Sequence, residues 1–124
     1  MSKCFFCSKE KKKILIESKL AYAFIDEYPV TRLHCLIVPK RHFASFFSIN
    51  DDELLEIKKL LVKCKEILLK KDNGIDGFNI GINDGIAAGQ SVFHLHVHLI
   101  PRRKGDLENP KGGVRGVIPK KRGY

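Results

Sequence analysis

The sequence lacks the long apolar segments of membrane and secreted proteins. Its 124 residues contain no apolar run of about 18 residues, the length that a membrane-spanning helix needs. No hydrophobic stretch typical of a signal peptide follows the first residues, Met1 to Cys4. We therefore expect a cytoplasmic protein that has no membrane partner.

A disulfide framework is also missing. The chain has 4 cysteines, of which only Cys4 and Cys7 are close in sequence, while Cys35 and Cys64 stand singly within apolar patterns. In a reducing compartment, a close pair of this kind favours metal binding over a disulfide. Internal repeats and long linkers are absent too, so residues 1–124 are expected to form a single domain.

Histidine is scarce but concentrated. Three of the 5 histidines alternate with leucine and valine between His94 and His98. Alternation with a period of two predicts a half-buried strand over 94–100, with the imidazoles on one face and the aliphatic side chains in the core. Pro101 is expected to end this strand. An imidazole can act as a nucleophile, a metal ligand or a hydrogen-bond donor to phosphate. The alternative to such a functional role is a strand face that is merely polar.

The remaining pattern predicts further strands at 14–17, 20–26, 34–38 and 76–82. One long helix is expected over 50–73, with Asn50 and Glu53 as a capping box. Its apolar spacing predicts a core stripe of Leu54, Ile57, Leu61, Cys64 and Leu68. Together these elements indicate an α+β domain with a mostly antiparallel five-stranded sheet.

The charge is strongly positive, with a net value of +9. Eight basic residues face only two acidic ones in residues 101–124, directly after the histidine strand. This excess favours anionic ligands, although a solvated basic tail would have the same composition. Nucleic acid is not an expected partner, because no aromatic and basic stripe of the RNA-recognition type is present.

The run His-Leu-His-Val-His-Leu-Ile at 94–100 resembles the signature of the histidine-triad (HIT) family. Three further blocks resemble the family in the right order: Ala23–Asp26, His34–His42 and Gly89–Val92. The resemblance covers residues 4–103 and implies a HIT-like fold with short helical segments, usually a homodimer. It also implies an enzyme that binds a nucleotide and cleaves at its α-phosphate, releasing a nucleoside monophosphate.

The same resemblance assigns roles to individual residues. His96 matches the nucleophile, His98 a phosphate contact and His34 a supporting histidine. Ser91 matches a residue beside the leaving group. The positions that match nucleotide-binding residues are Asp26, Asn83, Gly89, Gln90, Phe6 and Phe24. Ordinary structural roles remain open for His34, for Asp26 as a turn residue, and for the two phenylalanines as core.

A structural zinc site is a further implication. Some members of the family hold zinc with an N-terminal cysteine pair, a later histidine and the first histidine of the triad. The matching positions here are Cys4, Cys7, His42 and His94, and two thiolates with two imidazoles suit a closed tetrahedral site. Otherwise the two cysteines are small buried hydrophobic residues.

Residues 104–124 resemble a tail found in some bacterial and archaeal members. We expect this C-terminal extension to pack on the domain, with Arg115 as a candidate phosphate contact. The sequence leaves the substrate open between a dinucleoside polyphosphate and a nucleoside phosphoramidate. Two other hypotheses remain: a metal-dependent hydrolase that uses the three histidines as ligands, and a nucleotide-binding module without significant catalysis.

Overall fold

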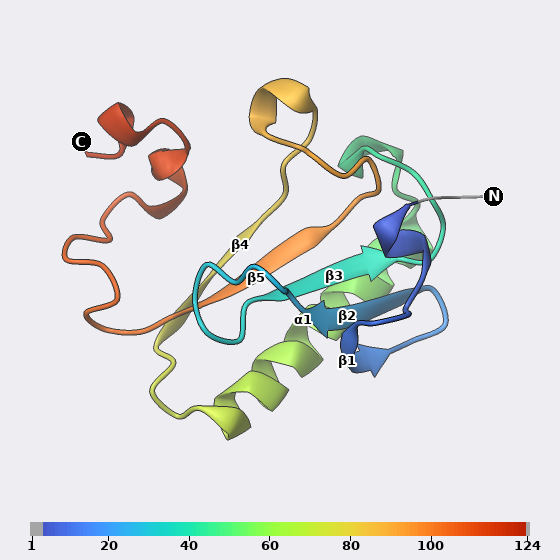
Figure 1. Ribbon diagram of the computed structural model, residues 1–124, viewed down its shortest axis with the longest axis horizontal. Helices are drawn as coiled ribbons and strands as arrows, with labels where there is room; N and C mark the ends of the chain where they lie inside the picture. The colour runs from blue at the N-terminus through green and yellow to red at the C-terminus, as the bar shows by residue number, and fades with distance from the viewer. Residues whose placement is uncertain (1–3, 124) are drawn as a thin grey trace.

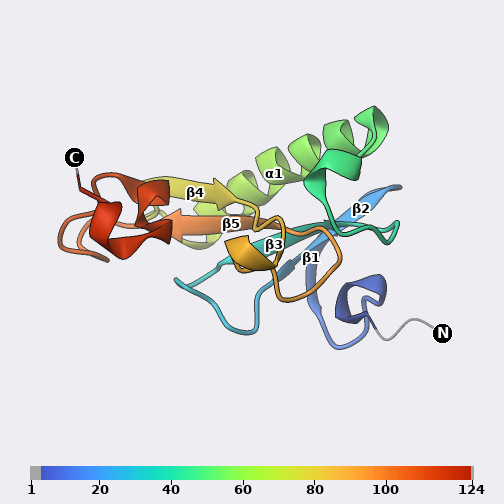
Figure 2. The same ribbon diagram turned by 90° about the horizontal axis from the view of Figure 1, so that it is seen from above.

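The structure is a computed structural model that describes residues 4–123, so residues 1–3 and 124 of the predicted domain lie outside it. A five-stranded antiparallel sheet in the order β1-β2-β3-β5-β4 carries helix α1 on one face (Figures 1 and 2). The elements are β1 (Lys13–Glu17), β2 (Ala21–Ile25), β3 (Cys35–Pro39), α1 (Asp51–Lys71), β4 (Gly77–Gly81) and β5 (Val97–Arg102). Five short 3-10 turns complete them: η1 (Phe5–Cys7), η2 (Phe46–Ser48), η3 (Ile86–Ala88), η4 (Gly113–Val117) and η5 (Pro119–Lys121). The predicted α+β fold is confirmed.

Strand β3 occupies the middle of the sheet, between β2 and β5. All five of its residues are buried, as its unbroken apolar run predicts for a strand covered on both faces. Strands β1 and β4 form the two edges, and Ile80 of β4 is 53% exposed there. The side chains between the sheet and α1 form the main core, so the opposite face is left for the candidate site.

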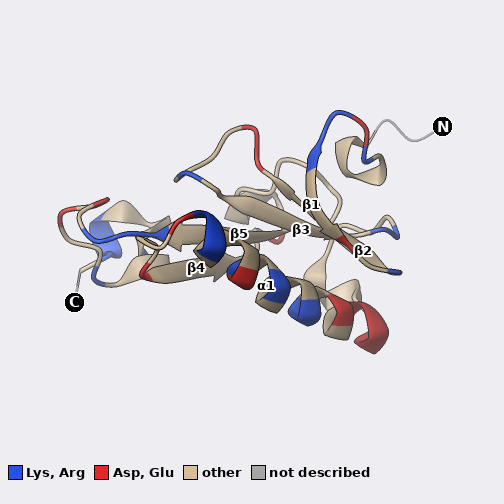
Figure 3. Ribbon diagram, turned by 90° about the horizontal axis from the view of Figure 1, so that it is seen from below, with Lys and Arg blue, Asp and Glu red and all other residues tan. Residues whose placement is uncertain are grey.

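Helix α1 begins with the predicted capping box: Asn50 accepts from the backbone N–H of Glu53, and the Glu53 carboxylate accepts from that of Asn50. Acidic residues occupy its first turn and Lys70 and Lys71 its last, which complements the helix dipole (Figure 3). No helix within residues 4–123 is long and apolar enough to cross a membrane.

The core stripe of α1 is partly different from the prediction. Ile57, Cys64 and Leu68 are buried as expected, but Leu54 is 43% exposed, and Leu60 is buried where Leu61 was predicted. The stripe is rotated because Glu53 turns inward to meet Arg41, whose guanidinium donates to both carboxylate oxygens at 2.8 and 2.9 Å. These hydrogen bonds lower the pKa of Glu53 and keep its buried carboxylate charged. Apolar spacing alone could not show this pair.

The histidine strand also has different bounds. Regular strand geometry begins only at Val97 and continues through Pro101 to Arg102, so the expectation that Pro101 ends the strand is wrong. Beyond Leu99, β5 pairs with β4 alone. The carbonyl of Pro101 accepts from the Thr31 hydroxyl on the other side, at 2.7 Å. Because a residue's N–H and carbonyl point to the same side of a strand, the missing N–H of Pro101 interrupts no ladder.

The C-terminal extension turns back beside β4 and β5 (Figure 1). Its start is fixed by Arg102, which donates to both Asp106 oxygens at 2.8 Å and to the Asn79 side-chain carbonyl at 2.7 Å. Further along, Gly112 has φ +92°, and an added Cβ there would lie 2.2 Å from the carbonyl oxygen of Arg122. This close approach of two backbone segments requires glycine.

Candidate active site

The histidines of the 94–98 run lie on the sheet face opposite α1. Their neighbours Leu95, Val97 and Leu99 are in the main core, so the predicted alternation of faces is confirmed. His94 and His96 are buried and His98 is partly buried. The rings do not act as one group, however: His94 turns towards the N-terminal cysteines, while the His96 and His98 rings lie 5.2 Å apart at a pocket.

The N-terminal cluster has the geometry of a tetrahedral metal site. The His94 Nδ1 atom lies 3.4 Å from Cys4 Sγ, 3.6 Å from Cys7 Sγ and 3.2 Å from His42 Nδ1. Cys7 Sγ is 3.3 Å from His42 Nδ1, and all four ligand atoms lie within 4.8 Å of one another. Typical zinc bond lengths place sulfur about 3.5 Å from nitrogen and two nitrogens about 3.3 Å apart around a tetrahedron.

The buried member of this cluster is also oriented by the backbone. The His94 Nε2–H donates to the carbonyl of Pro39 at 2.7 Å, which leaves Nδ1 as the coordinating atom. A hydrogen bond of this kind fixes the tautomer of metal-binding histidines and strengthens them as ligands. The donor set and its spacing therefore fit a zinc ion.

A backbone carbonyl likewise sets the proton position on His96. The carbonyl of His94 lies 2.9 Å from His96 Nδ1, and a carbonyl can only accept. The neutral ring therefore carries its proton on Nδ1, and Nε2 keeps an unshared electron pair. The ring packs on Phe6, with centroids 4.8 Å apart, in the wall of the pocket. This is the arrangement that a nucleophilic imidazole needs.

A chain of hydrogen bonds places the proton of His98 on the other ring nitrogen, Nε2. The backbone N–H of Val30 donates to His34 Nδ1 at 3.0 Å, so the neutral His34 ring carries its proton on Nε2. That Nε2–H faces His98 Nδ1 at 3.0 Å and donates to it. The proton of His98 is therefore on Nε2, which is buried and has no partner within residues 4–123. An unpaired buried donor at a pocket suits an anionic oxygen.

Burial keeps both of these rings neutral. Desolvation lowers the pKa of His34, although the Asp26 carboxylate 3.6 Å away opposes the shift. Desolvation, followed by the neighbouring His96 and His34, lowers the pKa of His98 to about 4. Asp26 itself is held by the backbone N–H of Tyr28, which donates to it at 3.0 Å. Val30 and His94 thus determine through their backbones which ring nitrogen each catalytic candidate presents.

We expect His98 to remain neutral, with its proton on Nε2, at a pH midway between its lowered pKa of about 4 and the ordinary value of 6.5. Imidazole ¹⁵N chemical shifts of the folded protein measure both the charge and the tautomer. The same protein unfolded in urea is the control, because its histidines should titrate near about 6.5. A charged His98 ring in this range, or a proton on Nδ1, would contradict the assigned chain of hydrogen bonds.

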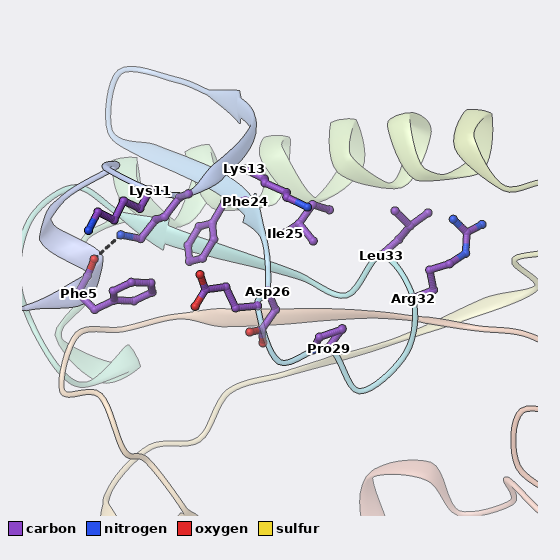
Figure 4. A pocket seen from close by; sticks show the side chains of 11 residues that line it. Phe5, Lys11, Lys13, Phe24, Ile25, Asp26, Pro29, Arg32 and Leu33 are labelled. Atoms are coloured by element: carbon purple, nitrogen blue, oxygen red, sulfur yellow. Dashed lines mark hydrogen bonds between the residues drawn. The ribbon is translucent and has the colours of Figure 1, made fainter.

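The pocket beside His96 and His98 has a volume of about 460 Å³. Its walls include three predicted nucleotide-site residues, Phe6, Phe24 and Asp26, together with Ser91. An adjoining hollow of about 470 Å³ shares Phe24 and Asp26 and is bordered by basic side chains (Figure 4). Phe5, Glu27 and Tyr28 also line the pocket, and the family resemblance assigned them no role. For Phe5 and Tyr28 the available signal was an aromatic residue within two positions of Phe6 or Asp26.

The other predicted residues lie around the loop between β4 and β5. Gln90 is buried, and its amide accepts from Gly85 N–H at 2.8 Å and donates to the carbonyl of Ala44 at 2.9 Å. It therefore braces the loop instead of facing the pocket. Gly89 has φ +93°, a left-handed turn that glycine favours. Asn83 lies outside the pocket, in a neighbouring groove that also includes His98.

Comparison with known proteins gives one consistent result. Residues 8–105 match the family model described as "HIT domain". An adenosine 5'-monophosphoramidase of Candida albicans is 37% identical over 107 residues, which cover 81% of this chain and 70% of that protein. Two solved structures have the same fold. A zinc-bound histidine triad family protein from Mycobacterium smegmatis has a TM-score of 0.77 and 31% identity, covering 86% of this chain and 80% of that one. The diadenosine triphosphate hydrolase of Plasmodium falciparum has a TM-score of 0.72 and 30% identity, covering 81% and 67%.

Proposed function

The chain belongs to the HIT family of nucleotide hydrolases, and from this premise we propose that it cleaves at the α-phosphate of a nucleotide through a covalent nucleotidyl-histidine. The substrate class is a dinucleoside polyphosphate or a nucleoside phosphoramidate, and the product is a nucleoside monophosphate. One observation carries the proposal: an imidazole with an unshared pair on Nε2 stands beside an imidazole with an unpaired Nε2–H, at one pocket.

The proposed reaction has two displacements at phosphorus. In the first, His96 Nε2 forms a bond to the α-phosphorus, and the bond from phosphorus to the leaving oxygen or nitrogen breaks with its electron pair. The His98 Nε2–H donates to a phosphoryl oxygen, where negative charge increases in the transition state. We assign Ser91, which lines the pocket, to donate to the leaving atom. In the second displacement, water attacks the phosphorus and His96 leaves.

The nucleoside part fits the rest of the pocket. Phe6 and Phe24 supply an aromatic wall, with their ring centroids 5.8 Å apart, against which a base can pack. The Asp26 carboxylate stands at the end of β2, within the same pocket and close to His34. A carboxylate can accept from both hydroxyl groups of a ribose, so we assign Asp26 to the ribose.

Asp26→Ala is expected to weaken the binding of a ribonucleoside monophosphate by about 1–3 kcal/mol, because a charge-assisted hydrogen bond is lost. Calorimetric titration of the variant and the original protein measures this difference. The matched control is the 2'-deoxynucleotide, which lacks one of the two hydroxyl groups and should lose less affinity on the same substitution. Equal affinity of both proteins for the ribonucleotide would remove Asp26 from the ribose site.

We also propose that Cys4, Cys7, His42 and His94 hold one structural zinc ion per chain. The support is the fit of their ligand atoms to a tetrahedron and the zinc-bound family structure from Mycobacterium smegmatis. Two thiolates and two imidazoles complete the four positions, so such a site stabilises the fold and leaves no position for substrate. The zinc would join the N-terminal segment to the turn after β3 and to the segment that precedes β5.

The three histidines of the triad form no common metal cluster within residues 4–123, since His94 groups with the cysteines. A metal-dependent hydrolase is kept as a second candidate with other ligands, because ligand atoms of Asp26, His34 and His98 also lie within 4.8 Å of one another. However, His34 Nε2 and His98 Nδ1 face each other at 3.0 Å and share one proton, which a metal ligand would have to lose. Full turnover in the presence of a chelator that leaves the structural zinc in place would exclude this candidate. A complete lack of turnover of every substrate without chelator would favour the third hypothesis, a binding module.

The homodimer and the cytoplasmic location stay proposals. Edge strand β4 and the exposed apolar residues Ile80, Leu55 and Val62 leave surfaces that a second copy of the chain could cover.

A further inference from the structure

A second groove lies on the same face of the sheet, on the other side of His98 from the nucleoside pocket. Its volume is about 570 Å³, and it runs between strands β4 and β5 and the C-terminal extension. The family model ends at residue 105, so the outer wall of this groove comes from residues outside the matched domain. Nothing in the proposed function so far uses this groove.

His98 joins the two spaces. It lines both the nucleoside pocket and the groove, and its Nε2–H is the unpaired buried donor assigned to the α-phosphate. In an in-line displacement the leaving group departs on the side of phosphorus opposite the nucleophile. His98 lines two spaces, and with the nucleoside in one of them and the phosphate at His98, the groove is the one that remains for the leaving group.

The charge in this groove favours an anionic leaving group. Two arginines line it, and the first, Arg102, is committed to Asp106 and Asn79. The second, Arg122, is partly buried and has no ion pair with a carboxylate within residues 4–123. A guanidinium without a carboxylate partner is well suited to bind phosphate with two parallel hydrogen bonds. Arg115, the contact expected from the sequence, is exposed and does not line the groove.

The rest of the lining suits a second nucleoside. Ile100 from the sheet and Leu107, Val114 and Val117 from the extension line the groove, so an apolar surface accompanies the charged groups. The backbone of the extension is held in place by the close approach of Gly112 to Arg122. A small amine leaving group would contact little of this surface, whereas a nucleotide with a phosphate chain has both the charge and the apolar area to use it.

We propose that this groove is the leaving-group subsite and that it selects a leaving group carrying phosphate and a nucleoside. The proposal rests on the proposed function and narrows its substrate class to dinucleoside polyphosphates. Arg122 binds a phosphate of the departing nucleotide, and the apolar lining accommodates its base.

The first test compares two substrates that share the same transferred nucleotide. The leaving group of diadenosine tetraphosphate is a nucleotide, adenosine triphosphate. The leaving group of an adenosine 5'-phosphoramidate is a small amine. For Arg122→Ala we expect the ratio of kcat/KM between diadenosine tetraphosphate and the phosphoramidate to fall about 10- to 100-fold, because hydrogen bonds to a charged group are lost. Lys120→Ala is the matched control, since Lys120 is an exposed cation of the same extension outside the groove, and its ratio should not change.

The second test fills the groove from the sheet side without touching Arg122. Gly81 lines the groove opposite His98, and an added Cβ there meets no atom within 4 Å. Gly77, four residues earlier on the same strand and face, is equally open but lies outside the groove. Gly81→Val should therefore lower the same substrate ratio, and Gly77→Val should leave it unchanged. Thermal unfolding of each variant shows that the comparison is between folded proteins.

The outcomes separate this proposal from the function on which it rests. If the original protein cleaves both substrates and neither Arg122→Ala nor Gly81→Val lowers the ratio, the subsite is overturned and the proposed function stands. If the original protein cleaves neither substrate, the proposed function fails, and the subsite fails with it. A lowered ratio in both groove variants, with unchanged ratios in both controls, supports the subsite.

Discussion

His96→Ala is expected to lose nearly all turnover, on the order of 10⁴-fold or more in kcat, as other enzymes do when their nucleophile is removed. The physical reason is that no other imidazole at the pocket offers a free electron pair for the first displacement. His34 and His98 present an N–H or share one proton with each other, so neither offers a free electron pair there. Steady-state kinetics with an adenylated substrate measure the loss.

The His96 variant should still bind the nucleoside monophosphate, because Asp26, Phe24 and His98 are unchanged. This binding is the control that separates a missing nucleophile from a damaged pocket. His96→Gly offers a second control: it opens space for added imidazole, which should restore part of the activity. Retention of more than about a tenth of the turnover by His96→Ala would contradict the nucleophile assignment.

Chirality at phosphorus tests the covalent step directly. Two in-line displacements, first by His96 and then by water, return the α-phosphorus to its original configuration. A substrate with a stereogenic α-phosphorus should therefore yield a product with net retention. An inverted product would mean that water attacks the substrate directly, and the nucleotidyl-histidine would have to be abandoned.

Loss of the zinc ligands should have the second large effect, on stability. The purified protein is expected to contain about one zinc per chain, and the double variant Cys4→Ser, Cys7→Ser should contain none. When the free zinc concentration is 100 times the Kd of the site, zinc binding adds about 2.7 kcal/mol to the free energy of unfolding. Loss of this contribution from a domain of this size lowers Tm by roughly 10 °C. Elemental analysis and thermal unfolding measure the two quantities.

The chain supplies a matched control for the zinc experiment. Cys35 and Cys64 are buried in the main core and lie outside the cluster. Cys64→Ala should keep the zinc, even though it alters the core and lowers stability slightly. Zinc content therefore separates ligand loss from simple destabilisation. A protein purified without metal that unfolds at the same temperature before and after zinc is added would refute the structural site.

Local patterns were sufficient for much of the fold. The alternation around His96 predicted which side chains enter the core, because successive residues of a strand leave opposite faces. The capping box of Asn50 and Glu53 was predictable because it involves residues only three positions apart. The apolar run of β3 predicted burial on both faces, and the structure confirms it.

Where local patterns failed, a distant partner was the cause. The stripe of α1 rotates because Arg41, twelve residues away, draws Glu53 inward. Strand β5 continues through Pro101 because β3, whose first residue Cys35 pairs with Leu99, has no residue opposite Pro101. This depends on the register of three strands. Neither partner can be read from the segment that it changes.

The sequence by itself determined the α+β class, the positions of most elements and the concentration of chemistry in three alternating histidines. It could not separate the functions of those histidines, since the residues are alike and evenly spaced. The tertiary structure decided this through the groups that meet each ring. The cysteines face His94, a carbonyl sets the proton on His96, and the N–H of Val30, relayed through His34, sets it on His98. Ring polarity depends on partners far apart in the chain, and only the folded backbone brings them together.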